Sequence, residues 1–450
     1  MNSRPKLDLS PEDLEILIEA IRRAEQVKPS QAAKREVFTK RGILGSSRDR
    51  FLTAILYEIL KRQGMIDRAI VDIVGVEKPL ILDPWLRASM RVALGITLFF
   101  NPTNKTMENL RKSVSKFLSR ITHPFVSMYY WELYDKIAEY KFRPRDRGEE
   151  LEFQYMLPRW FIDDMRQLLG DSEAEELFKA LNERLPLSLR VNSLKATVQE
   201  VVKELEREGK KPYVSKIVPT IIKLNEPYDL SRSKLYREGY IVVQDEAAAL
   251  ASLLLNPKPG EVVVDLCAAP GGKTSHMAEL MRNEGVIHAF DIDERRIERM
   301  KIILRRMGIT NVKIYIEDAV KAPELLGYEV ADRVLLDPPC SSTGTFMKNL
   351  ELRWRIHKDY VSELVELQRK LLETSIKLLK PGGFLLYTTC SLLPDENEEN
   401  IKWLLSQHSE LELVKLNGPY SRGFLDGTMR AWPHKHATTG FFYALLKKSA

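Results

Sequence analysis

The stretch Glu261–Leu280, EVVVDLCAAPGGKTSHMAEL, joins an apolar strand pattern to a helix through a turn of small residues and paired glycines. The strand pattern ends at Asp265, and Gly271 and Gly272 let the backbone of the turn approach a ligand closely before the helix begins. From here to the C-terminus, strand and helix patterns alternate. This alternation predicts an α/β domain with a mainly parallel, Rossmann-like sheet and helices on both faces.

Carboxylates stand at the ends of several of the predicted strands. Asp265 ends the first strand, and Asp291, Asp318 and Asp337 end the strands read from VIHAFDID, VKIYIED and RVLLDPP. Because ligands of open parallel sheets bind at the carboxyl ends of the strands, these side chains are expected in one crevice. Asp291 is placed to accept hydrogen bonds from ribose hydroxyls and Asp318 to bind an adenine edge, whereas Asp265 is expected only to fix the turn. An adenosyl ligand satisfies both assignments.

The turn after Asp265 has a competing interpretation as a phosphate loop. Gly272-Lys273-Thr274 fits the end of the G-x-x-x-x-G-K-[ST] pattern, but Cys267 replaces its leading glycine. The turn is not G-x-G-x-x-G either, so the dinucleotide-binding fingerprint is absent. A phosphate-loop nucleotide hydrolase therefore remains an alternative, with weaker support.

The N-terminal half predicts two further domains. Apolar residues recur at helical spacing from about Ser10 to Tyr140, and Ile81–Phe100 is apolar enough for the central helix of a bundle. The charged run Lys141–Glu150 breaks this periodicity and predicts a linker. A mixed α/β texture then follows, including the strand LSLRVN, a helix capped by Thr197 and the strand PTIIKL. We expect domains over residues 1–145, 150–245 and 246–450.

Composition and charge limit the cellular location and the binding partners that we expect. The net charge of +6 and the pI near 8.9 permit a polyanionic partner. No apolar run approaches the roughly 18 residues that span a bilayer, and the N-terminal stretch MNSRPKLDLSPEDLE lacks the apolar core of a secretory signal. We expect a cytoplasmic monomer that does not bind membranes. No CxxC pair, HExxH motif or His/Cys cluster predicts a metal site.

The three cysteines, Cys267, Cys340 and Cys390, all follow predicted strands of the one sheet. A free cysteine is most often a small buried apolar residue, and Cys267 fits that description best. Cys340, in DPPCSSTG, and Cys390, in YTTCS, are both expected to face the crevice. Carbon 5 of cytosine takes up a methyl group only after a nucleophile adds to carbon 6, and a thiolate can make that addition. Asp337 could supply the carboxyl that the reaction needs near N3. The spacing does not decide which cysteine attacks.

These motifs resemble those of the Fmu/Sun RNA cytosine-5 methyltransferases. The resemblance rests on DLCAAPGGKT, FDID, DPPCSSTG, LLYTTCS with PDENEEN after it, and RAWPHKHATTGFFYALLKK. It extends to the small domain through LRVN and IVVQDEAAAL, whose expected fold is ferredoxin-like. More weakly, the helices around LDPWLRASMRVALG resemble a NusB-like RNA-binding bundle.

The resemblance implies S-adenosylmethionine as cofactor and RNA as substrate; the NusB-like bundle favours ribosomal RNA, and transfer RNA stays open as an alternative. It assigns the nucleophile to Cys390 and product release to Cys340, with Asp337 and Lys273 beside the base. The implied cofactor site comprises Cys267, Ala268, Ala269, Pro270, Gly271, Gly272, Lys273, Asp291, Asp318 and Asp337. A third interpretation, a non-catalytic RNA-binding or assembly factor, is disfavoured because Cys340 and Cys390 are both present.

Overall fold

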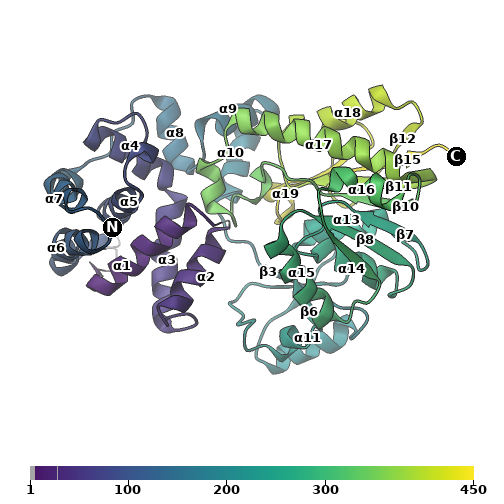
Figure 1. Cartoon of the computed structure of the whole chain (residues 1–450), viewed down its shortest axis with the longest axis horizontal. Coiled ribbons are helices and arrows are strands. Elements are labelled where there is room, and N and C mark those ends of the chain that lie inside the picture. The colour runs from purple at the N-terminus through teal and green to yellow at the C-terminus, as the bar shows by residue number, and fades with distance from the viewer. Residues whose placement is uncertain (1–5, 28) are drawn as a thin grey trace. The chain divides into compact units, whose positions relative to one another are not determined.

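The computed structural model describes residues 6–27 and 29–450 (Figure 1). Part of the stretch used against a secretory signal, residues 1–5, lies outside the described residues. The contacts divide the chain into two compact units: residues 1–178 with 348–355, and residues 179–347 with 356–450. We call these the helical unit and the catalytic unit. Within the described residues, none of the helices combines the length and apolar character that a bilayer-spanning segment needs.

The helical unit begins with the predicted bundle. Its helices are α1 (Pro11–Ala24), α2 (Ser30–Lys40), α3 (Ser47–Lys61), α4 (Gln63–Val74), α5 (Pro84–Phe99), α6 (Asn104–Ile121) and α7 (Pro124–Glu139), with the short pieces β1 (Lys6–Leu7), η1 (Pro79–Ile81) and β2 (Asn101–Pro102). Ser10 caps α1 through a capping box with Asp13, as the start signal predicts. Most of α5 is buried, which confirms it as the central helix. Its Arg91 is buried between Glu25 and Asp67, at 2.6 Å from each.

Three more helices follow the charged run: α8 (Arg147–Tyr155), α9 (Arg159–Leu169) and α10 (Asp171–Ala180). The linker is therefore shorter than Lys141–Glu150, because Asp146 accepts the Glu149 N–H at 2.8 Å and caps α8. The predicted boundary near residue 150 also differs from the contact division, which falls after Phe178.

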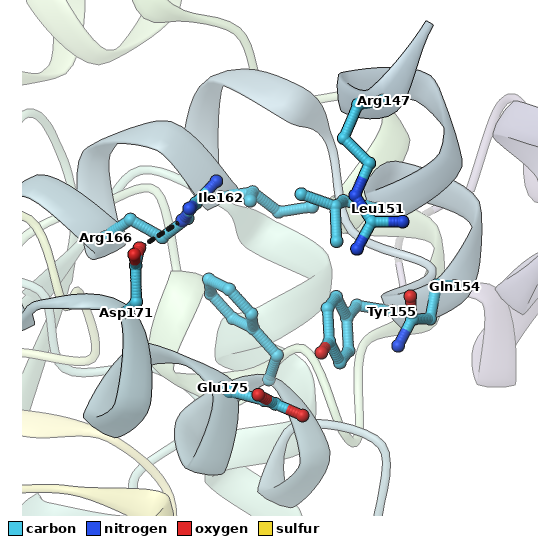
Figure 2. Close-up of a pocket in the computed structure, with 9 residues that line it drawn as sticks. Arg147, Leu151, Gln154, Tyr155, Ile162, Arg166, Asp171 and Glu175 are labelled. Carbon is cyan, nitrogen blue, oxygen red and sulfur yellow. Dashed lines mark hydrogen bonds and ion pairs between the residues drawn. The ribbon is translucent and has the colours of Figure 1, made fainter.

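A pocket of about 330 Å³ opens between α8, α9 and α10 (Figure 2). Tyr155 and Phe178 form an aromatic pair in it, with ring centroids 5.2 Å apart. Its two arginines are already paired with carboxylates, Arg166 with Asp171 at 2.6 Å and Arg147 with Glu150 at 2.7 Å.

The helical unit also holds the segment Lys348–Arg355, which includes η4 (Leu350–Trp354). The Glu351 carboxylate accepts both the N–H and the Oγ–H of Ser30, each at 2.8 Å. Trp354 Nε1 donates to the Lys61 carbonyl at 3.1 Å, and its ring lies so close to Gly64 that a Cβ there would be 2.2 Å from it. The chain thus leaves the catalytic unit a few residues after Cys340 and packs on the helical bundle before it returns.

The catalytic unit begins with a small four-stranded antiparallel sheet in the order β4-β5-β3-β6. Its strands and helices are β3 (Leu187–Val191), α11 (Val198–Arg207), β4 (Tyr213–Val214), β5 (Ile221–Leu224), α12 (Lys234–Arg237) and β6 (Ile241–Val243). Thr197 caps α11 through a capping box with Glu200, as predicted. The predicted small α/β subdomain is confirmed.

The large sheet has the order β13-β14-β15-β11-β10-β7-β8-β9, with β12 paired to β15. The strands β7 to β11 are parallel, and β15 is antiparallel to β11. The strands are β7 (Val262–Asp265), β8 (Val286–Asp291), β9 (Val312–Ile316), β10 (Ala331–Leu336), β11 (Leu379–Thr389), β12 (Leu411–Val414), β13 (Ser421–Arg422), β14 (Met429–Ala431) and β15 (Phe441–Lys448). The predicted Rossmann-like fold is confirmed.

Helices cover both faces of this sheet (Figure 1). They are α13 (Glu246–Leu255), α14 (Gly272–Leu280), α15 (Glu294–Met307), α16 (Ala322–Leu326), α17 (Lys358–Leu378), α18 (Glu398–Gln407) and α19 (Pro433–His436), with the 3-10 turns η2 (Ala319–Lys321), η3 (Thr343–Thr345) and η5 (Pro394–Glu396). Successive strand residues enter opposite cores: Val263 packs with α13–α15, and Val264 with α16–α18. The central strand β7 is therefore apolar on both faces up to Asp265.

Candidate active site

The turn after β7 is fixed by a buried carboxylate. Asp265 is 1% exposed and accepts the Oγ1–H of Thr274, in the first turn of α14, at 2.7 Å. Burial raises the pKa of Asp265 to about 7, against the opposing hydrogen bond from Thr274. Asp265 therefore holds the strand to the helix, as its position before the turn predicts.

Glycine is required where this turn reverses. Gly271 has φ of 94°, and a Cβ there would lie 2.8 Å from Met300 Cγ on α15. Its N–H donates to the Ala268 carbonyl at 2.8 Å. The turn consequently presents backbone, rather than side chains, beside the first turn of α14.

Asp291 and Asp318 stand at the ends of the neighbouring strands β8 and β9, as predicted. Asp291 is 5% exposed, and its carboxylate accepts the N–H groups of Ala269 and Asp293, each at 3.0 Å. Arg296 lies 3.4 Å from it. Asp318 is exposed and caps η2 by accepting the Val320 N–H at 3.0 Å. Both carboxylates therefore hold the local backbone through hydrogen bonds, and both lie at the edge of the sheet where the glycine turn lies.

Lys273 and Asp337 form an ion pair between the first turn of α14 and the end of β10. Burial disfavours the charged lysine, but Asp337 and then Cys390 outweigh it and raise the pKa of Lys273. The ammonium also lies 5.2 Å from the centre of the Phe441 ring on β15. The lysine that completes the partial phosphate-loop pattern is thus engaged by a carboxylate.

Cys340 and Cys390 are brought together, with their Sγ atoms 3.3 Å apart and both thiols free. Ser342 Oγ lies 3.3 Å from the Cys390 sulfur and 3.9 Å from the Cys340 sulfur. The hydrogen bond with Cys390 is the largest cause that raises the pKa of Cys340, followed by burial and by the charges of Cys390, Glu396 and Asp337. The thiolate form of Cys340 is therefore disfavoured at this position.

Cys267, the third cysteine, lies in the glycine turn and is half-buried. Burial is the main cause that raises its pKa, and Asp337, Asp265 and Asp291 add to the effect. A thiol that stays protonated is a poor nucleophile, in keeping with a structural role.

Several residues of the site are absent from the sequence prediction. Arg190, on β3, is fully buried and donates to the Gly272 carbonyl at 2.8 Å, to Ser275 Oγ at 2.8 Å and to Glu279 at 2.7 Å. It therefore supports α14 from the small sheet. An arginine within the apolar strand LSLRVN was a readable signal for such a buried contact. Ser342, Phe441 and Glu396 had no comparable signal, because only tertiary structure brings them here.

Comparison with known proteins identifies the family. The probable ribosomal RNA small subunit methyltransferase B of Synechocystis sp. is 31% identical over 413 residues, which cover 89% of this chain and 91% of the relative. The chain belongs to the RsmB/F family of methyltransferases. It matches the family described as 16S rRNA methyltransferase RsmB/F over residues 252–447, and the RsmF/B-like ferredoxin-like domain over residues 157–231. The second match confirms the ferredoxin-like prediction. The nucleotide hydrolase and the non-catalytic factor are thereby set aside.

Solved structures agree with this assignment. The crystal structure of PH0851 shares 55% sequence identity and a TM-score of 0.92, covering 99% of this chain and 100% of its own. The crystal structure of NSun6 from Pyrococcus horikoshii with SFG is 27% identical, with a TM-score of 0.61 over 65% of this RsmB/F chain and 98% of its own. The similarity to NSun6 is therefore partial, whereas that to PH0851 spans the whole chain.

Proposed function

We propose that this RsmB/F methyltransferase methylates carbon 5 of a cytosine in ribosomal RNA, through a covalent bond between Cys390 and carbon 6 of the base. The observation that carries the proposal is the pair of thiols 3.3 Å apart, next to the Lys273–Asp337 ion pair. A site for direct methylation of an exocyclic amine needs neither thiol. The small-subunit rRNA methyltransferase B relatives favour small-subunit ribosomal RNA as the substrate.

Cys390 is the better nucleophile of the two. The causes that raise the pKa of Cys340 keep the shared proton on that sulfur, whereas Cys390 lies where the Lys273 ammonium responds to its charge. The thiolate of Cys390 adds to carbon 6, and the resulting enamine makes carbon 5 nucleophilic. Asp337, which pairs with Lys273, is assigned the role of binding the proton at N3 of the base.

Cys340 is assigned to the release step. After methylation, a water molecule takes the carbon 5 proton, the electrons of that bond restore the double bond between carbons 5 and 6, and the Cys390 sulfur leaves carbon 6 as a thiolate. The Cys340 thiol, 3.3 Å from that sulfur, can donate a hydrogen bond to it as the carbon–sulfur bond breaks. A donor at this position stabilises the leaving thiolate, because hydrogen bonds to charged groups are stronger than those to neutral ones.

The glycine turn and the strand-end carboxylates fit an adenosyl cofactor. The absence of a Cβ at Gly271, the carboxylate of Asp291 and the exposed carboxylate of Asp318 match a ligand with ribose hydroxyls and an adenine amine. S-adenosylmethionine supplies the methyl group when bound, and the Pyrococcus horikoshii NSun6 structure contains SFG, an analogue of it. The turn residues Cys267–Lys273 with Asp291, Asp318 and Asp337 form the proposed cofactor site.

The helical unit is assigned to RNA contacts rather than to chemistry. Its NusB-like character, the cytoplasmic location and the monomeric state stay predictions from the sequence. No group of three or more His, Cys, Asp or Glu side chains gathers as a metal site among residues 6–27 and 29–450.

The test separates the two cysteines by the step that each variant blocks. Cys390→Ala is expected to form neither 5-methylcytosine nor a covalent complex, because no thiolate adds to carbon 6. Cys340→Ala is expected to add to the base and then stall, giving a denaturant-resistant protein–RNA band on a gel. The double variant is expected to give no band.

The control is Glu399→Gln, which changes an exposed residue outside the site and is expected to leave the band pattern of the parent protein. A trapped band in Cys390→Ala, with none in Cys340→Ala, would move the nucleophile to Cys340 in DPPCSSTG. Bisulfite mapping of the product RNA identifies the methylated cytosine. Absence of 5-methylcytosine from small-subunit rRNA treated with active enzyme would refute the assigned substrate.

A further inference from the structure

Glu396 is a fully buried carboxylate six residues after Cys390, in η5. Its Oε1 accepts the Ser341 N–H at 2.8 Å and the Gln368 amide at 2.9 Å. Its Oε2 accepts the hydroxyls of Ser341 and Ser391. Four donors therefore converge on one carboxylate, and among the described residues no ion pair of Glu396 with a cation is found.

Two of these partners adjoin the cysteines. Ser341 follows Cys340 directly, and Ser391 follows Cys390. The pairing of β10 with β11 ends at Leu336 and Tyr387, so the ladder does not extend to either cysteine. Beyond the ladder, two side chains in the described part of the chain bond to both of the residues next to the thiols. The Thr343 hydroxyl lies 3.4 Å from each serine hydroxyl, whereas the Glu396 carboxylate makes closer bonds with both residues.

Other contacts join the same two segments but do not replace this bond pattern. The Gly344 N–H donates to the Cys390 carbonyl at 2.9 Å, and the Leu392 N–H donates to Thr343 Oγ1 at 2.9 Å. The Ser341 and Ser391 hydroxyls also lie 3.0 Å apart, so Glu396 adds to a link that the two segments already share. Removal of Glu396 is therefore expected to loosen the thiol pair while the segments stay attached.

The charge of Glu396 is the unusual part. A buried carboxylate loses its hydration, and a neutral glutamine of the same shape could fill the space at lower cost. The negative charge, however, is one of the causes that raise the pKa of Cys340, with the Cys390 hydrogen bond, burial, Cys390 and Asp337. The buried charge thus acts on one thiol of the pair.

We propose that Glu396 is a positioning residue of this site: its carboxylate sets the Cys340 and Cys390 segments in register, and its charge keeps the shared proton on Cys340. The proposal rests on the proposed function for its catalytic consequence, but the thiol geometry and protonation can be measured without RNA. In catalysis, Glu396 acts at the release step, where a protonated Cys340 must face the leaving Cys390 sulfur.

The test compares Glu396→Gln with Glu399→Gln. Glu399 lies in the same acidic run, is exposed and pairs with Lys402 at 2.7 Å, so its variant is the matched control. Labelling of each cysteine by iodoacetamide is followed by peptide mass spectrometry across pH. Thiolates are the reactive form, so a lower pKa appears as faster labelling. In Glu396→Gln we expect Cys340 to label at least tenfold faster than in the parent at pH 8.

The groups that face Cys340 are Cys390, Asp337, Glu396 and, through Asp337, Lys273. Glu396→Gln changes only one of them, and its amide can still accept the Ser341 N–H. In turnover, Glu396→Gln is expected to lower kcat at least tenfold, to leave KM for RNA within twofold and to accumulate the covalent band. Glu399→Gln is expected to match the parent in both assays.

Ser391→Ala separates position from charge, because it keeps the carboxylate and removes a hydroxyl that bonds to Glu396, Ser341 and Thr343. We expect it to lower kcat without changing the pH dependence of Cys340 labelling. The proposal would be overturned if a folded Glu396→Gln protein had the labelling rate and kcat of the parent. It would also be overturned if Glu396→Gln lowered the thermal stability and changed neither of these two quantities. If Glu396→Gln does not fold, an unchanged kcat in Ser391→Ala overturns the positioning role. Failure to find 5-methylcytosine with the parent enzyme would refute the proposed function instead. The labelling experiment would still test the effect of Glu396 on the thiols, because it is done without RNA.

Discussion

The contact between Glu351 and Ser30 joins residues 321 positions apart, and its loss should be measurable. Glu351 is 1% exposed and accepts two hydrogen bonds at 2.8 Å from Ser30, the first residue of α2. A hydrogen bond to a charged group contributes about 1.5–3 kcal/mol, and a carboxylate at a helix N-terminus adds about 0.3–1 kcal/mol. Since these effects are not additive, we expect Glu351→Ala to lower the free energy of unfolding by about 3 kcal/mol.

A double-mutant cycle attributes this loss to the contact. Ser30→Ala removes only the hydroxyl bond and should cost about 1.5 kcal/mol. The free energy of unfolding is measured by urea denaturation for Ser30→Ala, Glu351→Ala and the double variant, with hydrogen exchange of α2 as the local readout. We expect the double variant to lose at least about 0.5 kcal/mol less than the sum of the single losses. Strict additivity, or a Glu351→Ala loss below about 1 kcal/mol, would refute the reasoning.

Glu36→Ala is the control for the loss of a glutamate near the same helix. Glu36 is exposed and pairs with Arg23 at 2.9 Å, so its replacement should change the free energy of unfolding by less than about 1 kcal/mol. The contact also bears on truncation. Deleting residues 1–141 to test RNA binding would uncover Glu351 and Trp354, whose partners lie in that stretch. Surface substitutions on the bundle are the cleaner test of its RNA contacts.

Two further predictions concern the cofactor edge of the sheet. Asp291→Ala should weaken the binding of S-adenosylmethionine by on the order of a few kcal/mol, because it leaves polar groups of the ligand unpaired. Asp291→Asn should lose less binding free energy. Unchanged calorimetric binding would show that Asp291 only caps the turn. Asp265 has a pKa raised to about 7, above its unfolded value near 3.8, so its neutral form favours folding at low pH and that stability is lost as pH rises towards 7. Asp265→Asn can still accept the hydrogen bond from Thr274. We expect this variant to reduce the change of the free energy of unfolding with pH by up to about 1.4 kcal/mol per pH unit between pH 4 and 7. The same pH dependence in urea denaturation of both proteins would contradict this.

The sequence was sufficient to predict which strand ends meet. Asp291, Asp318 and Asp337 follow parallel strands, and parallel strands place their carboxyl ends on one edge whatever the side chains do afterwards. The same rule predicts that Cys340 and Cys390 approach each other, and their sulfurs lie 3.3 Å apart. Periodicity likewise predicted the helical bundle, because its apolar stripes are local properties of each helix.

The contacts that hold these elements in place were not predictable, since they depend on burial that only tertiary structure creates. Glu396, Glu398 and Glu399 are close neighbours in one acidic run, yet the first two are buried and the third is exposed. Glu398 pairs with the buried Arg430, which also donates to the Leu392 carbonyl at 2.9 Å. Nothing in PDENEEN distinguishes a solvated carboxylate from one that fixes a loop.

The difference between Glu396 and Glu398 explains why the segment after Cys390 carries two buried carboxylates. Glu398 is neutralised by Arg430, so its effect on the segment is positional and its field at the sulfurs is small. Glu396 is held only by neutral donors, so its charge is not cancelled locally and reaches Cys340. A site in which one thiol attacks the base and the other donates a hydrogen bond needs such an asymmetry. Apolar packing could fix the distance between the sulfurs, but it could not decide which of them holds the proton.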